Sequence, residues 1–125
     1  MARGSDSDKV LGPLEAEVME ALWAAGEPRS VREVVETVNA RRREPLAYTT
    51  VMTVMNRLAD KDILRRERQG RGYVYEPTAT DPAGIAVRSV IRQFGDAAMA
   101  HFVEEAKADP DVLRRLERLL GEEES

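Results

Sequence analysis

The segment from residue 46 to 77 carries the side chains best suited to contact another molecule. It reads LAYTTVMTVMNRLADKDILRRERQGRGYVYEP. Its first half predicts a helix, because apolar residues recur at the i, i+3, i+4 and i+7 spacing of one buried face: Val51, Val54, Met55 and Leu58. The other face carries short hydrogen-bonding groups, a thioether and a cation: Thr49, Thr50, Met52, Thr53, Asn56 and Arg57. Such a face suits a DNA major groove, where Thr and Asn can reach base edges or phosphates.

A basic hairpin is expected directly after this helix. Residues 64–69 and 73–76 are predicted strands, joined by a Gly70-Arg71-Gly72 turn and closed by Pro77. Four side chains of the hairpin are candidate contacts to phosphate or to the adjacent minor groove: Arg65, Arg66, Arg68 and Arg71. Tyr48 and Tyr73 are interpreted as packing residues of the hinge and of the hairpin in preference to a functional role. A polar-faced helix followed by a basic hairpin is the order of a winged helix-turn-helix.

Two earlier segments supply the other helices of such a domain. The first begins after Gly12-Pro13, ends at Gly26 and carries a predicted apolar stripe: Leu14, Val18, Ala21, Leu22 and Ala25. The second begins at a capping box formed by Ser30 and Glu33, and its predicted buried face comprises Val31, Val34, Val35 and Val38. It should end before Pro45, which disfavours helical geometry in the preceding residue.

The charge is unevenly distributed along the chain. The whole sequence has a net charge of −4, which by itself would not suggest a nucleic-acid partner. Residues 29–72, however, hold eleven Arg and Lys against six Asp and Glu, whereas residues 81–125 hold six against ten. The basic excess of +5 therefore falls on the segment that contains the proposed recognition helix and most of the hairpin. Because DNA affinity depends on local phosphate contacts, this distribution favours a double-stranded DNA partner.

The last third of the chain predicts three short amphipathic helices. Asp81-Pro82 and Asp109-Pro110 are helix starts, and Gly95-Asp96 marks a break between them. Short helices of this kind cannot bury their apolar sides alone, so a two-fold homodimer is expected. The side chains expected in its interface are Ile91, Phe94, Phe102, Leu113, Leu116 and Leu120. A monomer in which these helices fold back on the winged helix is the alternative.

These observations predict a mainly α chain with a small β-hairpin wing. The expected parts are a disordered N-terminus (1–10), a winged helix-turn-helix (11–80), a helical dimerisation domain (81–120) and a frayed tail (121–125). The chain has no cysteine and one histidine, His101, so neither a catalytic site nor a metal or other cofactor is expected. It also has no long apolar run, which predicts a cytoplasmic protein without membrane contact of its own.

The run AYTTVMTVMNRLADKDIL, with LEAEVMEALW before it and RGYVYEP after it, resembles the penicillinase-repressor (BlaI/MecI) family of bacterial transcription repressors. The resemblance extends over residues 11 to 120, and the T-V-x-T-x-x-x-R-L segment is its most specific part. It implies a dimeric repressor that binds inverted-repeat operators. Two departures limit the analogy. Met52 stands where better-known staphylococcal members are basic, and the cysteine-rich metal hook of the copper-responsive branch (CopY) has no counterpart.

The resemblance also implies a route of induction. In the family, a membrane-bound sensor metalloprotease cuts the repressor between an Asn and a Phe of the dimerisation domain. The matching pair here is His101-Phe102, in which Phe102 is retained and His101 replaces the asparagine. The competing interpretation makes Phe102 an aromatic of the dimer core and His101 its exposed neighbour.

Two other functions compete with a protease-released repressor. One is a MarR-like or PadR-like regulator that a small-molecule ligand releases from DNA. The C-terminal segment is short for a roomy pocket, and its polar residues do not converge. The other is a winged helix that contacts proteins and has no role at DNA. The threonine-rich outer face and the basic excess over residues 29–72 argue against it.

Overall fold

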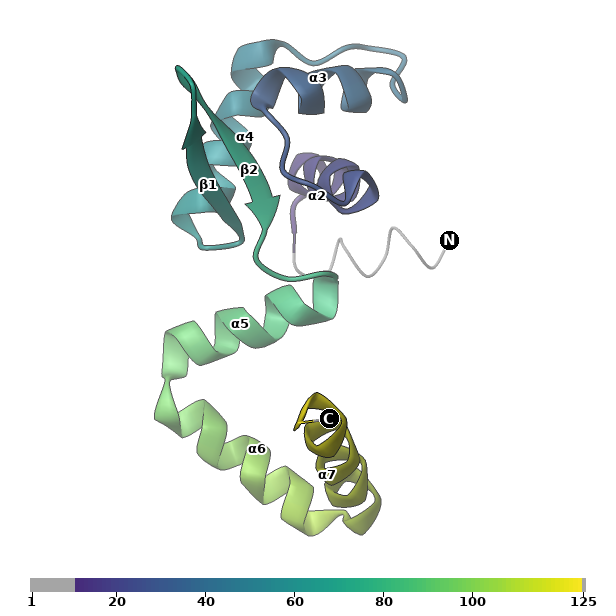
Figure 1. The fold of residues 1–125 in the computed structure, drawn as a ribbon, viewed down its shortest axis with the longest axis vertical. Coiled ribbons are helices and arrows are strands. Elements are labelled where there is room, and N and C mark those ends of the chain that lie inside the picture. Colours follow the sequence, from purple (N-terminus) through teal and green to yellow (C-terminus); the bar gives the residue numbers. More distant parts are fainter. Residues whose placement is uncertain (1–10, 125) are drawn as a thin grey trace. The chain divides into compact units, whose positions relative to one another are not determined.

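The computed structural model describes residues 11–124 of the chain (Figure 1). Its elements are α2 (Pro13–Ala25), α3 (Val31–Asn39), α4 (Tyr48–Asp60), β1 (Leu64–Gln69), β2 (Gly72–Pro77), α5 (Pro82–Phe94), α6 (Asp96–Ala108) and α7 (Pro110–Glu124). The two strands form one antiparallel hairpin. The predicted fold class, mainly helical with a small hairpin, is confirmed. The N-terminal segment predicted to be disordered, residues 1–10, lies outside the described residues, as does residue 125.

The chain divides into two compact units, Met1–Ala86 and Val87–Ser125. The division falls inside α5, six residues beyond the domain boundary predicted at residues 80 and 81. Ile85 explains the difference, because this first-turn side chain of α5 is buried in the core of the first unit. In that unit α2, α3 and α4 pack against one another, and β1 and β2 pack along them. The largest fully buried side chains are Met19, Leu22, Met55, Leu58 and Leu64.

Local capping fixes where the helices begin and end. Ser30 Oγ accepts from the Glu33 amide at 3.2 Å, and Glu33 Oε1 accepts from the Ser30 amide at 2.9 Å, as the capping box predicts. That bond from the Ser30 backbone holds the pKa of Glu33 below its ordinary value. Helix α2 ends at Gly26, whose φ of +69° is a left-handed cap that glycine adopts without steric cost.

The buried face of α2 differs from the predicted stripe. Met19 and Ala16 are buried but were not predicted, whereas Leu14 and Ala25 are half-buried. In α3, Val31, Val34 and Val38 are buried as predicted, but Val35 is half-buried. The reason in α2 is its position, because this helix contacts α3, α4 and β2 and therefore buries more than one stripe.

The hairpin turn is tighter than predicted. Gln69 pairs with Gly72, so Gly70 and Arg71 alone form the loop, and Gly72 and Pro77 belong to β2. Gly70 has a φ of +62°, and Arg71 is not among the described residues with positive φ. These signs match a type II′ turn, which needs glycine at its first central position and follows the natural twist of a hairpin.

The last three helices begin at Pro82, after a break at Gly95, and at Pro110, as predicted, and the second unit consists of the rest of α5 with α6 and α7. Helices α6 and α7 pack against each other, and Ala98 and Ala106 are buried. Helix α7 continues to Glu124, through most of the segment predicted to fray. Within residues 11–124, no helix has both the length and the apolar character that a bilayer span requires.

Candidate nucleic-acid interface

Helix α4 presents the polar face that its sequence predicts. Its buried side chains are Val51, Val54, Met55 and Leu58, all four as expected. On the outer face Thr49, Thr53 and Arg57 are exposed, whereas Thr50, Met52 and Asn56 are half-buried. The helix therefore offers hydroxyl groups, one thioether and one cation along a single side, while its other side is anchored in the core.

The connection before α4 is held by one side chain at the end of α3. Asn39 Nδ2 donates to the Leu46 carbonyl at 3.0 Å, and Asn39 Oδ1 accepts from the Leu46 amide at 2.8 Å. The loop itself is tied to α2, because Arg42 Nη1 donates to Glu17 Oε2 at 2.7 Å. These contacts fix the first turn of α4 relative to the other two helices of the helix-turn-helix.

The other end of α4 is anchored through a buried carboxylate. Glu15 of α2 accepts from the Gly12 amide at 3.1 Å and from Lys61 Nζ, at the C-cap of α4, at 3.0 Å. Burial alone would raise the pKa of Glu15, but these two bonds, with the charges of Lys61 and Arg57, outweigh it and lower the pKa. The Glu15–Lys61 ion pair therefore joins the first turn of α2 to the end of α4, the candidate recognition helix.

Strand alternation divides the arginines of the hairpin between two faces. Arg66 and Arg68 lie on one face, opposite Tyr75 and Tyr73 of the partner strand. Their guanidinium carbons lie 5.6 Å and 5.8 Å from the centre of the Tyr73 ring, within cation–π range. Arg65 lies on the other face, where its Nη2 donates to Glu76 Oε1 at 2.8 Å.

Arg71 occupies the tip of the turn and is exposed. The four arginines predicted as one set thus occupy three settings: ordered by Tyr73, paired with Glu76, or projecting at the turn. Tyr73 is 44% exposed and is not part of the buried core; its ring contacts the guanidinium groups of Arg66 and Arg68.

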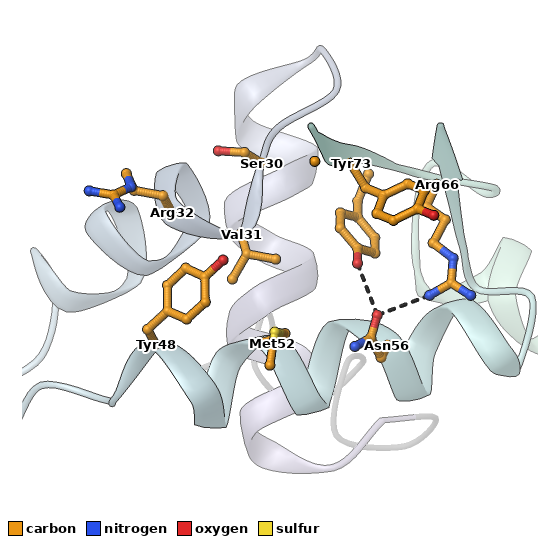
Figure 2. Close-up of a pocket in the computed structure, with 10 residues that line it drawn as sticks. Ser30, Val31, Arg32, Tyr48, Met52, Asn56, Arg66 and Tyr73 are labelled. Atoms are coloured by element: carbon orange, nitrogen blue, oxygen red, sulfur yellow. Dashed lines mark hydrogen bonds between the residues drawn. The ribbon is translucent and has the colours of Figure 1, made fainter. Parts of the chain in front are cut away.

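A groove of about 540 Å³ lies between the start of α3, the outer face of α4 and the hairpin. Figure 2 shows Ser30, Val31 and Arg32 on one side of it, Met52 and Asn56 on α4, and Arg66 and Tyr73 on the hairpin. Tyr48 also lines the groove and is 48% exposed, so it is not the packing residue that was predicted. Ser30 and Arg32 were not predicted as site residues: Ser30 was predicted only as a helix cap.

Asn56 has contacts that the sequence did not indicate. Its Oδ1 accepts from Tyr75 Oη at 2.9 Å and from Arg66 Nη1 at 3.0 Å, shown as dashed lines in Figure 2. Asn56 was predicted to reach a base edge or a phosphate, and in the structure it links α4 to both strands of the hairpin. The cross-strand pairing of Arg66 with Tyr75 would have indicated a shared neighbour, but that pairing could not be assigned before the turn length was known.

The second unit presents the apolar face that was expected to form a dimer. All six side chains predicted for it are exposed in the single chain: Ile91, Phe94, Phe102, Leu113, Leu116 and Leu120. His101 lies on the surface of α6, where its Nδ1 is 3.2 Å from Glu104 Oε1. Among the described residues, no cluster of His, Cys, Asp or Glu could hold a metal ion.

Three helices followed by an antiparallel hairpin, with a polar-faced third helix beside a basic strand pair, define the winged helix-turn-helix class. Solved structures share this fold at low sequence identity. The complex structure of hsRosR-S1 matches with a TM-score of 0.52 and 14% identity, over 94% of this chain and 95% of that one. MepR, a transcription regulator of the Staphylococcus aureus multidrug efflux pump MepA, matches with a TM-score of 0.51 and 13% identity, over 97% and 86%.

Sequence relatives give the family. The penicillinase repressor family model matches residues 11–122. The transcriptional regulator BlaI of Mycobacterium tuberculosis, in strains CDC 1551 and H37Rv, is 44% identical over 84% of this chain and 80% of the relative. The chain belongs to the penicillinase repressor family and is a DNA-binding transcription regulator rather than an enzyme. The resemblance inferred from the T-V-x-T-x-x-x-R-L segment is confirmed.

Proposed function

We propose that this chain is a dimeric repressor in which α4 enters the major groove and the hairpin lies on the adjacent backbone or minor groove. Each protomer would bind one half of an inverted repeat. The observation that carries the proposal is the shared groove: the outer face of α4 and the arginine-bearing face of the hairpin both line it. One duplex could therefore contact a hydrogen-bonding helix and a cationic strand pair at once.

The chemistry of each side chain suggests its part in DNA recognition. Thr50 and Thr53 carry hydroxyls that can donate to or accept from base edges, and Met52 can pack on a thymine methyl group but cannot bind guanine bidentately. Thr49 and Arg57, exposed at the edges of the same face, are suited to phosphate. The operator of this protein should therefore differ from that of relatives with a basic residue at the position of Met52.

On the hairpin, Arg68 and Arg71 are the strongest candidates for DNA backbone contacts. Arg71 projects from the turn, and Arg68 is held against Tyr73, which restricts its rotamers before DNA arrives. Arg65 would first have to leave Glu76 or share its charge with that carboxylate. Although an exposed pair of this kind costs little to break, the Glu76 carboxylate reduces the positive charge that Arg65 offers to a phosphate, so Arg65 is a weaker candidate.

Dimerisation would provide the second half-site contact. The exposed apolar side chains of α5, α6 and α7 form surfaces that a second copy of the chain would bury. A dimer gains affinity because binding of the first winged helix holds the second one at a high effective concentration near its half-site. A monomer has no such advantage.

We further propose that proteolysis between His101 and Phe102 relieves repression, through a membrane-bound sensor metalloprotease. This peptide bond lies within α6. A protease binds extended backbone, so α6 would have to unfold locally before cleavage. The cut would separate Phe102 and all of α7 from the DNA-binding unit. It would thereby remove four of the six side chains predicted for the dimer interface: Phe102, Leu113, Leu116 and Leu120.

Salt dependence of duplex binding tests the proposal. A protein that contacts several phosphates loses affinity with salt along a log–log slope of about −0.9 per contact. Fluorescence anisotropy with a labelled random duplex should show a steep slope, and substituting Arg68 and Arg71 by Ala should reduce its magnitude by about two. The matched control is Arg88→Ala with Arg92→Ala, which removes the same charge outside the winged helix. Duplex binding that is independent of salt would contradict the proposal.

A further inference from the structure

The carbonyl oxygen of Asn56 is fully used inside the protein. It accepts from Tyr75 Oη at 2.9 Å and from Arg66 Nη1 at 3.0 Å. A guanidinium can only donate hydrogen bonds, so Asn56 must turn its carbonyl, and not its amide nitrogen, toward Arg66. Two donors satisfy the two lone pairs of that oxygen. The side chain is thus held in one orientation from two directions (Figure 2).

This arrangement conflicts with the usual way in which asparagine recognises a base. In bidentate recognition of adenine, the carbonyl accepts from the N6 amino group while the amide nitrogen donates to N7. The carbonyl of Asn56 is already engaged by Tyr75 and Arg66. Breaking those bonds would leave Tyr75 Oη without its acceptor, on a residue that is only 3% exposed.

The same contacts connect α4 to both strands of the hairpin. Arg66 and Tyr75 are cross-strand partners, and both contact Asn56 in the third turn of α4. We call these three residues the clasp, because together they join one cross-strand pair of the hairpin to α4. Tyr75 is fixed further by its backbone, which pairs with Arg29 through bonds of 3.0 Å and 2.8 Å. Arg66 in turn lies over the ring of Tyr73, which also orders Arg68.

We propose that Asn56 is a positioning residue, which sets the hairpin against α4 and orients Arg66 and Arg68, and that it does not read a base. The inference rests on the proposed function, in which α4 and the hairpin bind one duplex together. It confines direct readout to the first two turns of α4, where Thr50, Met52 and Thr53 lie. Sequence preference should therefore be independent of the Asn56 amide, whereas affinity for every duplex should depend on its carbonyl.

Amide hydrogen exchange of the free protein tests the clasp without DNA. Tyr75→Phe and Asn56→Leu each remove bonds of the clasp, and we expect exchange in both strands to accelerate about three- to tenfold. Asn56→Asp should exchange like the unmutated protein, because a carboxylate accepts from both donors. The matched control is Glu76→Gln, which removes the ion pair on the opposite face of the same hairpin and should change little.

Two results of this measurement would overturn the clasp. One is unchanged strand exchange in both Tyr75→Phe and Asn56→Leu. The other is equal acceleration in the amides of α2, since this would show a general loss of stability rather than release of the hairpin.

The second experiment tests whether Asn56 affects affinity or sequence preference. It compares binding to a duplex selected from random sequences with binding to a scrambled duplex of the same composition. Asn56→Leu should lower the affinity for both duplexes by a similar factor. In a double-mutant comparison, the loss of affinity caused by Arg71→Ala should be smaller in the Tyr75→Phe background than in the unmutated protein. A loss confined to the selected duplex would show base reading and overturn the proposal. If the unmutated protein binds neither duplex in a salt-dependent way, the proposed function fails instead, and hydrogen exchange still decides whether the clasp exists.

Discussion

The apolar face of α7 gives a quantitative prediction for the dimer. Leu116 and Leu120 are 41% and 65% exposed in the single chain, which together amounts to about one whole leucine side chain. Burying a leucine contributes about 2 kcal/mol, and a two-fold interface counts each change twice. Replacing both leucines by Asp should therefore cost about 4 kcal/mol, a factor of roughly 10³ in the dissociation constant. Repulsion between the new carboxylates would add to this loss.

Sedimentation velocity at micromolar concentration measures the outcome. The unmutated chain should sediment as a dimer and the double Asp variant as a monomer with the same helix content by circular dichroism. Arg118→Asp is the matched control, because it changes the charge by the same two units on the opposite face of α7 and should leave the dimer intact. A monomeric unmutated chain, or a double variant that remains dimeric, would refute the assignment of this face.

Three further predictions concern DNA reading, pH and induction. Thr50→Ala should remove about 1–3 kcal/mol of discrimination between preferred and mismatched duplexes, whereas Arg71→Ala should weaken binding to all duplexes alike and lower the magnitude of the salt slope by about one. Fluorescence anisotropy in a salt series measures both effects. An equal loss of affinity for all duplexes in Thr50→Ala would refute base recognition by Thr50. Glu15→Gln should lower the free energy of unfolding by about 1–2 kcal/mol at neutral pH, a moderate figure because Lys61 is half exposed. Since the folded-state pKa of Glu15 is lowered, denaturant melts should show this difference vanishing as the pH falls from about 4.5 through the lowered pKa, and a difference that persists in acid would refute the role of the ionised carboxylate. In cells in which exposure to a β-lactam relieves repression, mass spectrometry of the protein should find cleavage between His101 and Phe102, and an intact chain in such derepressed cells would exclude it.

Helix starts could be predicted because their signals are local. The Ser30–Glu33 box, Pro82 and Pro110 each act within one helical turn, so sequence neighbours alone determine them. Which side chains of α2 are buried could not be predicted in the same way. That helix is apolar on several sides and contacts three other elements, so burial of Met19 depends on the packing of the whole unit.

In the candidate interface, too, features with local sequence signals could be predicted, whereas contacts that depend on tertiary packing could not. The outer face of α4 follows from helical periodicity, and the structure places Thr49, Thr53 and Arg57 where the period puts them. The bond from Tyr75 to Asn56 joins residues 19 positions apart and depends on how the hairpin packs on α4. The ion pair between Arg65 and Glu76 likewise needed the strand register, which the two-residue turn determines.

Sequencing of the genomic DNA fragments that the purified, unmutated protein retains tests the central claim most directly. A dimer with one α4 per half-site predicts enrichment of a two-fold symmetric motif, with half-sites about one helical turn of DNA apart or a multiple of it. Retention by the Thr50→Ala, Thr53→Ala variant should persist with a relaxed motif. Fragments without any shared inverted repeat, or an unchanged motif in that variant, would contradict the account of α4 as the reading helix.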